Sequence, residues 1–132
     1  MNDKTPWPNF KWHELACHCG QCEQSTALNI STILMHHIQI LRDRCGFPFD
    51  ITSAYRCNQH PDEQNKATPG THNRGLAVDI QVSGEQAHLL LLHAMTMGCF
   101  TGIGVKQKGP HDRRFIHLDI SKTTPRPWVW SY

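Results

Sequence analysis

The stretch GTHNRGLAVDIQV, residues 70–82, decides the fold of this 132-residue chain. Successive side chains of a β-strand point to opposite faces, so Val78, Ile80 and Val82 share one face of the segment and Asp79 lies on the other. The polar, glycine-containing residues before the apolar run predict a turn. The stretch therefore predicts a turn followed by a strand, with one face for the core and one face for chemistry.

A second alternating segment, residues 115–120, repeats this pattern nearer the end of the chain. Ile116, Leu118 and Ile120 occupy one face, and Phe115, His117 and Asp119 occupy the other. Shorter strands are expected over residues 49–53 and from Gly102 onward. If the two long strands lie in one sheet, their polar faces carry Asp79, His117 and Asp119.

Two helices are predicted between these strands. Apolar residues recur at helical spacing from Ser31 to Cys45, with Asn29 or Ser31 as the N-cap and Gly46 as the stop. Ser83 followed by Gln86 resembles a capping box, and a second helix is expected after it, up to Gly98. Helices and strands that interleave in a short chain favour an α+β fold, with helices packed on a small antiparallel sheet.

The chain is expected to form a single domain over residues 1–132, with an irregular arm, rich in aromatic residues and cysteine, at residues 1–24. The aromatic tail RPWVWSY, residues 126–132, is expected to pack back on the body. A net charge of +2 is too small for a dedicated nucleic-acid-binding protein. No apolar run is long enough for a membrane span, and the first residues lack the pattern of a secretory signal.

Ten histidines and six cysteines are many for such a chain, and a few of them can converge on a metal. His72, Asp79 and His117 form a ligand set that suits catalytic zinc, because three protein ligands leave a fourth position for water. The spacing alone is a weak signal. In the alternative interpretation, Asp79 pairs with a basic group and both histidines are surface residues.

Several motifs resemble those of zinc peptidases of peptidase family M15, in particular its small D-Ala-D-Ala carboxypeptidase branch, which includes phage endolysins. The matching blocks are Ser53-Ala-Tyr-Arg-Cys, the segment 70–80, Gly102-Ile-Gly-Val and Phe115-Ile-His-Leu-Asp. The resemblance implies a Hedgehog-type α+β fold around one zinc, with His72, Asp79 and His117 as ligands. It also implies that Arg56 contacts a substrate carboxylate or carbonyl, and Thr71 is a further substrate-binding candidate.

One position departs from the family pattern. Several branches place an acidic residue three positions before the last zinc histidine, as the base that deprotonates the attacking water. Arg114 stands there and cannot accept a proton. Asp119, on the same strand face as His117, is the first candidate for this role, and a role as the hydrogen-bond partner that orients His117 is equally natural. His111 and Asp112 on the adjoining turn are the next candidates, and zinc alone can also activate the water.

Cys17, Cys19 and Cys22 suggest a second, structural zinc site, completed by Cys57 or Cys45. Their spacing lacks the paired C-x-x-C of ordinary zinc ribbons. Reduced cysteines packed as small apolar residues, or a disulfide formed in an oxidising compartment, are the alternatives.

The leading hypothesis is a zinc-dependent peptidoglycan peptidase that cleaves a bond next to a D-amino acid in stem peptides or crosslinks. It is expected to act as a monomer on the cell wall. The start of the chain fits a phage lysin that passes through a membrane pore, and equally a secreted protein whose leader has been removed. The alternative hypothesis is a non-catalytic, zinc-bearing binding module of the same fold.

Overall fold

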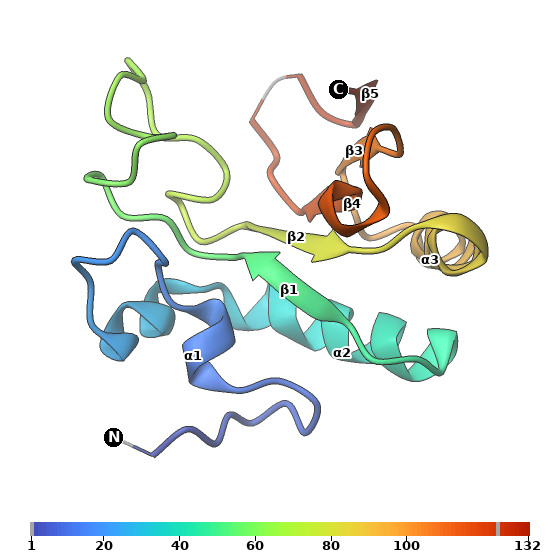
Figure 1. Ribbon diagram of the computed structural model, residues 1–132, viewed down its shortest axis with the longest axis horizontal. Helices are drawn as coiled ribbons and strands as arrows, with labels where there is room; N and C mark the ends of the chain where they lie inside the picture. Colours follow the sequence, from blue (N-terminus) through green and yellow to red (C-terminus); the bar gives the residue numbers. More distant parts are fainter. Residues whose placement is uncertain (1, 124) are drawn as a thin grey trace.

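A computed structural model describes residues 2–123 and 125–132 and shows helices packed on a mixed five-stranded sheet (Figure 1). The elements are, in chain order, α1 Trp12–Leu15, the 3-10 helix Gln24–Asn29, α2 Thr32–Cys45, β1 Asp50–Ser53, β2 Ala77–Gln81, α3 Gly84–Met97, β3 Gly102–Lys106, the 3-10 helix His111–Arg113, β4 Phe115–Asp119 and β5 Trp128–Ser131. The α+β class predicted from the sequence is therefore confirmed.

Helix α2 has the ends that its sequence predicts. The Ser31 hydroxyl accepts a hydrogen bond from the Leu34 backbone N–H at 3.2 Å, which satisfies one free donor of the first turn. Gly46 adopts the left-handed conformation that ends many helices, and its N–H donates to the Arg42 carbonyl. Ser31, rather than Asn29, is thus the N-cap.

The start of α3 differs from the prediction. Ser83 is the N-cap residue by backbone conformation, but its side chain makes no capping hydrogen bond, so the predicted capping box is wrong. The Ser83 hydroxyl lies 3.2 Å from Nδ1 of His111 instead, in the turn before β4. A tertiary contact has therefore replaced the local one.

The N-terminal arm is more ordered than expected. Residues 12–15 form the single turn of α1, where the Lys11 backbone N–H donates to the Glu14 carboxylate at 2.7 Å. Trp7 and Phe10 are buried in the main core, so this arm contributes to the packing of the domain.

The sheet has the strand order β1-β2-β4-β3-β5. The pairs β1–β2, β2–β4 and β4–β3 are antiparallel, as the sequence predicts. The aromatic tail supplies β5, which lies parallel to β3 at the edge of the sheet and makes the sheet mixed. The two termini lie at opposite ends of the molecule (Figure 1).

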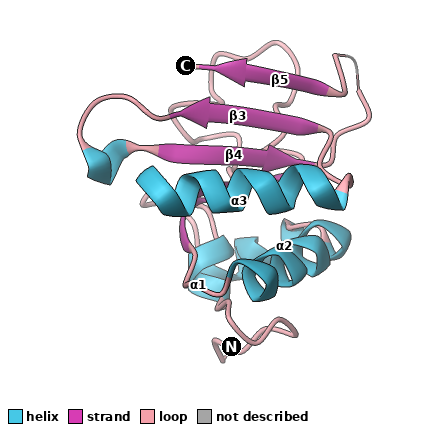
Figure 2. Ribbon diagram, turned by 90° about the vertical axis from the view of Figure 1, so that its right-hand side faces the viewer, coloured by secondary structure: helices cyan, strands magenta, loops and turns pink. Residues whose placement is uncertain are grey.

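The two faces of the sheet have different environments. Figure 2 shows α3 running across one face, with α2 beside it. Apolar side chains from alternate strand positions, among them Val78, Ile80, Ile116 and Leu118, are fully buried in the core that the helices cover. The intervening positions point to the opposite face. No helix in the described part of the chain is long and apolar enough to span a membrane.

Candidate metal centre and cleft

One row of residues crosses the sheet on the face away from the helices. Asp79 of β2 is paired with Ser53 of β1 on one side and with His117 of β4 on the other. His117 is paired in turn with Gly104 of β3, and Gly104 with Trp130 of β5. The strand register therefore sets Asp79 directly beside His117 in the centre of the sheet.

His72 reaches this row from the turn that precedes β2. The turn is closed by a hydrogen bond from the Leu76 N–H to the Thr71 carbonyl at 2.9 Å. Nδ1 of His72 lies 2.7 Å from the carbonyl oxygen of Ala54. A carbonyl only accepts hydrogen bonds, so Nδ1 carries the proton, and Nε2 faces Oδ1 of Asp79 at 3.1 Å.

His117 lies between two carboxylates. Its Nδ1 is 3.0 Å from Oδ1 of Asp79, and its Nε2 is 2.7 Å from Oδ2 of Asp119. Burial of the ring lowers the pKa of His117, but the hydrogen bonds to Asp119 and Asp79 outweigh it and raise the pKa above its usual value. Burial raises the pKa of Asp79, and the two histidines outweigh that effect and lower it.

The donor atoms of His72, Asp79 and His117 lie within 4.8 Å of one another, and all three residues are buried. Two imidazole nitrogens and a carboxylate oxygen that converge in this way can hold a metal ion. The set matches the nitrogen and oxygen ligands of catalytic zinc, for which three protein ligands leave one position open. The residues that the sequence singles out as ligands are thus brought together.

Asp119 is fully buried behind His117, and both of its oxygens are engaged. Arg126 donates to it through Nε at 3.0 Å and Nη2 at 2.8 Å, and the Ser121 N–H donates at 3.1 Å. Burial alone would raise the pKa of Asp119, but the contacts with His117 and Arg126 lower it to about 2. Sequence reasoning missed Arg126, whose only local signal is its place as the first residue of the aromatic tail.

A cleft of about 370 Å³ opens beside the three donor atoms. Arg56 lies in its wall, donating from Nε to the Ser53 hydroxyl at 2.9 Å and from Nη2 to Oδ2 of Asp79 at 3.3 Å. Thr71 also lines the cleft, as the sequence suggests. The remaining lining residues are Asp62, Lys66, Phe115, Trp130 and Tyr132.

One wall of the cleft therefore comes from Arg56 and the loop 57–75, and the other from Phe115 of β4, Trp130 of β5 and Tyr132, which follows β5. The turn 107–114 supplies none of the described lining residues. Gly104 makes room for the β5 wall, because a Cβ at this position would lie 2.6 Å from Nε1 of Trp130. The Trp130 ring then packs against His117, with the ring centroids 5.1 Å apart.

Glu63 is a buried carboxylate that the sequence did not single out. Its Oε2 lies 2.9 Å from the Lys66 ammonium and 3.8 Å from Arg56, and its Oε1 has no hydrogen-bond partner within the described residues. The Glu63 carboxylate therefore pairs with both Lys66 and Arg56 and helps to hold these two side chains in the cleft wall.

The cysteines form a second cluster outside the cleft. Sulfur atoms of Cys17, Cys19, Cys22 and Cys57 lie within 4.8 Å of one another and can hold a metal ion. Cys45, the other candidate for the fourth position, is buried in α2 among the apolar core residues. The Gln21 backbone N–H lowers the pKa of Cys19 to about 7.

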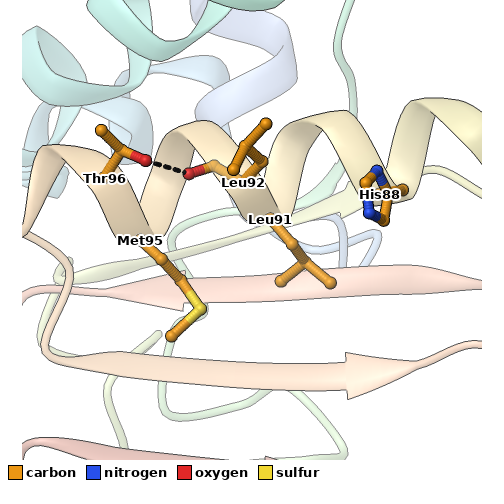
Figure 3. A pocket seen from close by; sticks show the side chains of 5 residues that line it. All are labelled: His88, Leu91, Leu92, Met95 and Thr96. Atoms are coloured by element: carbon orange, nitrogen blue, oxygen red, sulfur yellow. Dashed lines mark hydrogen bonds between the residues drawn. The ribbon is translucent and has the colours of Figure 1, made fainter.

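Another hollow lies over the outer side of α3 and differs in character from the cleft. His88, Leu91, Leu92, Met95 and Thr96 line it (Figure 3). Its polar interaction is internal to the helix, since the Thr96 hydroxyl donates to the Leu92 carbonyl at 2.7 Å. Polar side chains that converge on one point lie instead in the cleft beside Asp79.

Comparison with known proteins agrees with this geometry. No curated protein matches the chain significantly. A family model described as Peptidase M15 matches residues 8–119, a range that includes the three candidate ligands, Arg56 and all four clustered cysteines. The match covers most of the chain and ends at Asp119, the residue that supports His117. The chain therefore belongs to peptidase family M15.

Proposed function

We propose that the protein is a zinc-dependent peptidoglycan peptidase that hydrolyses a peptide bond next to a D-amino acid in stem peptides or crosslinks. The observation that carries the proposal is the convergence of His72, Asp79 and His117 at the edge of a cleft whose wall holds Arg56. Membership of a family of zinc peptidases supports both the metal and the reaction class.

The hydrogen bonds around His72 and His117 leave one unprotonated ring nitrogen of each directed at the site, as zinc binding requires. Zinc bound there would polarise the scissile carbonyl and lower the pKa of a water molecule. The Ala54 carbonyl keeps the proton of His72 on Nδ1, so its Nε2 lone pair is directed to the site. Asp119 does the same for His117, because it accepts from Nε2 and leaves Nδ1 free as a ligand atom.

Arg56 is proposed to bind the substrate carboxylate or the oxyanion that develops on the scissile carbonyl. Its guanidinium is held by Ser53 and Asp79, so it is oriented before substrate binds. Lys66 adds a second positive charge to the same wall, and Thr71 offers a hydroxyl. These groups offer partners for a carboxylate of a peptide substrate.

The proton acceptor is proposed to be Asp62 rather than Asp119. The side chain of Arg114 is turned away to the Gly109 carbonyl, at 2.9 Å. Asp119 is buried and paired with Arg126, which suits an orienting role. Of the carboxylates that line the cleft, Asp62 is the one outside the ligand trio; its side chain is 60% exposed and lies 3.8 Å from Arg56 Nη1.

The alternative is a zinc-bearing module that binds cell-wall peptides without cleaving them. Arg114 favours this alternative, because it occupies the position at which several family branches carry an acid. Such a module would keep the three metal ligands for stability. We therefore propose an experiment that separates binding from cleavage.

The test is digestion of purified peptidoglycan followed by mass spectrometry of the released muropeptides. The proposal expects a new product whose mass identifies one cleaved bond next to a D-amino acid, and no product with His117→Ala. A zinc-loaded protein that co-sediments with cell walls but releases nothing would establish the binding module instead. The cleaved bond, D-Ala-D-Ala, L-Ala-D-Glu or a crosslink, follows directly from the product masses.

A further inference from the structure

The four clustered cysteines come from two parts of the chain. Cys17, Cys19 and Cys22 lie in the loop between α1 and the 3-10 helix Gln24–Asn29, and Cys57 follows β1. Sulfur–sulfur distances are 3.5 Å for Cys17–Cys57, 3.5 Å for Cys19–Cys22 and 3.6 Å for Cys19–Cys57. Cys19 thus contacts two other sulfurs, and the four form a connected cluster.

These distances match the dimensions of a zinc–thiolate site. A zinc–sulfur bond of about 2.3 Å places the sulfurs of a tetrahedral site about 3.8 Å apart. A disulfide would require about 2.05 Å. The cluster therefore needs only a slight expansion to surround a metal, whereas two disulfides would require each sulfur pair to move together by well over an ångström.

One backbone N–H is directed at a sulfur of the cluster. The Cys57 N–H donates to the sulfur of Cys17 at 3.3 Å. Thiolates are the form of cysteine that binds metal, and N–H donors stabilise that charge. A bound metal cation would balance the charge of four clustered thiolates.

We infer that Cys17, Cys19, Cys22 and Cys57 bind a structural zinc ion that fastens the N-terminal arm to the segment after β1, which carries Arg56 of the cleft. This site is closed, because four thiolates complete a tetrahedron and leave no position for substrate. It is independent of the catalytic proposal, since it involves none of the three donors beside the cleft.

The position of Cys57 gives the site a consequence for the cleft. Cys57 directly follows Arg56, and the Arg56 backbone is fixed by hydrogen bonds to the His72 carbonyl at 3.2 Å and from the Asn73 side chain at 2.8 Å. The Tyr55 N–H donates to the Leu15 carbonyl at 3.2 Å, which joins the same segment to α1. A zinc ion at the cluster would hold the segment with Cys57 to the loop that follows α1.

The experiment is metal analysis of reduced protein purified without chelator, on the wild type and on variants. We expect two zinc ions per wild-type chain, one in His117→Ala and one in the double variant Cys19→Ser/Cys22→Ser. Cys99→Ser, a half-buried cysteine outside the cluster, is the matched control and should keep both. Cobalt substitution of His117→Ala should give the intense sulfur-to-metal charge-transfer absorption of a thiolate site.

Two results would overturn the inference, and neither depends on a folded cysteine variant. One is a His117→Ala protein that is folded by circular dichroism but contains no zinc and gives no charge-transfer band with cobalt. The other is a reduced wild-type protein in which the four cysteines react with a thiol reagent as fast in the native state as after unfolding. Loss of peptidase activity with both metals present would instead count against the proposed function alone.

Discussion

The histidine–aspartate trio and the cysteine cluster both gather metal-binding atoms within 4.8 Å, but they are built from different kinds of structure. Asp79 and His117 are direct partners in adjacent central strands, so hydrogen-bond register holds them together. The cysteines lie in loops, where no ladder fixes the distance between them. The trio is therefore organised by the fold, whereas the cysteine cluster is expected to depend on its metal for rigidity.

The clusters also differ in what surrounds the donors. The trio has an open side that faces the cleft, and its donors are buried and supported by further hydrogen bonds. The cysteine cluster has four sulfur donors, and none of these four cysteines lines the cleft. We propose that the trio serves chemistry and the cysteine cluster holds the N-terminal arm in place, and variants of each site can test this division.

The largest effect is expected from His117→Ala. The variant removes one donor of the trio and should lose one zinc ion and all measurable cleavage of peptidoglycan, because two donors hold zinc poorly. Muropeptide release and metal content are the measurements. A variant that still cleaves at a comparable rate after chelation and reloading would show that the trio is not the catalytic centre.

Asp62→Asn should lower kcat about 10²–10⁴-fold if Asp62 accepts the proton, because that is the usual contribution of a general base. Zinc content should stay at the wild-type value, since Asp62 is not among the candidate ligands. A matched control is Asp112→Asn, which changes an exposed carboxylate in the turn that lines no part of the cleft. Equal activity of the two variants would remove Asp62 from the mechanism.

Arg56→Lys is expected to lower kcat/KM by about 10²–10³-fold, the range seen when one stabilising donor is removed. Lysine keeps the charge but cannot reproduce the planar guanidinium that binds Ser53 and Asp79 together. Zinc content and melting temperature should change little. Wild-type kinetics in this variant would assign substrate binding to other residues.

Asp119→Asn distinguishes an orienting residue from a base. Loss of the partner that fixes a metal-bound histidine typically costs about 10–100-fold in metal affinity or activity. We expect the zinc dissociation constant to rise by that factor and excess zinc to restore most of the activity. Retained zinc affinity with a rate about a thousandfold lower would make Asp119 the base after all.

Gly104→Ala should have the smallest effect on chemistry. The added Cβ would lie 2.6 Å from Trp130, so the indole must leave its place beside His117. Overpacking of this kind typically costs about 1–3 kcal/mol of stability. We expect a lower melting temperature, a change in tryptophan fluorescence and a higher KM, with both zinc ions retained. Unchanged fluorescence and KM would show that the Trp130 wall does not contact substrate.

Much of the fold follows from local sequence patterns. The limits of α2 were predictable because Ser31 and Gly46 act on backbone groups within one turn of themselves. The face assignment of Asp79 and His117 was predictable because side chains in a strand alternate with a period of two. The predicted capping box at Ser83 was wrong, because the Ser83 hydroxyl contacts the distant residue His111 and not a backbone N–H of its own helix.

The sequence by itself determined the α+β class, the main helix and strands, and the residue types His72, Asp79 and His117 on which a metal site could be built. Only the tertiary structure decided that the tail pairs with β3 as β5, that Arg126 neutralises Asp119, and that Cys57 rather than Cys45 completes the cysteine cluster. The physical reason is distance along the chain. Helix caps and strand faces depend on neighbours a few residues away, whereas these contacts join segments whose meeting depends on the packing and strand register of the whole domain.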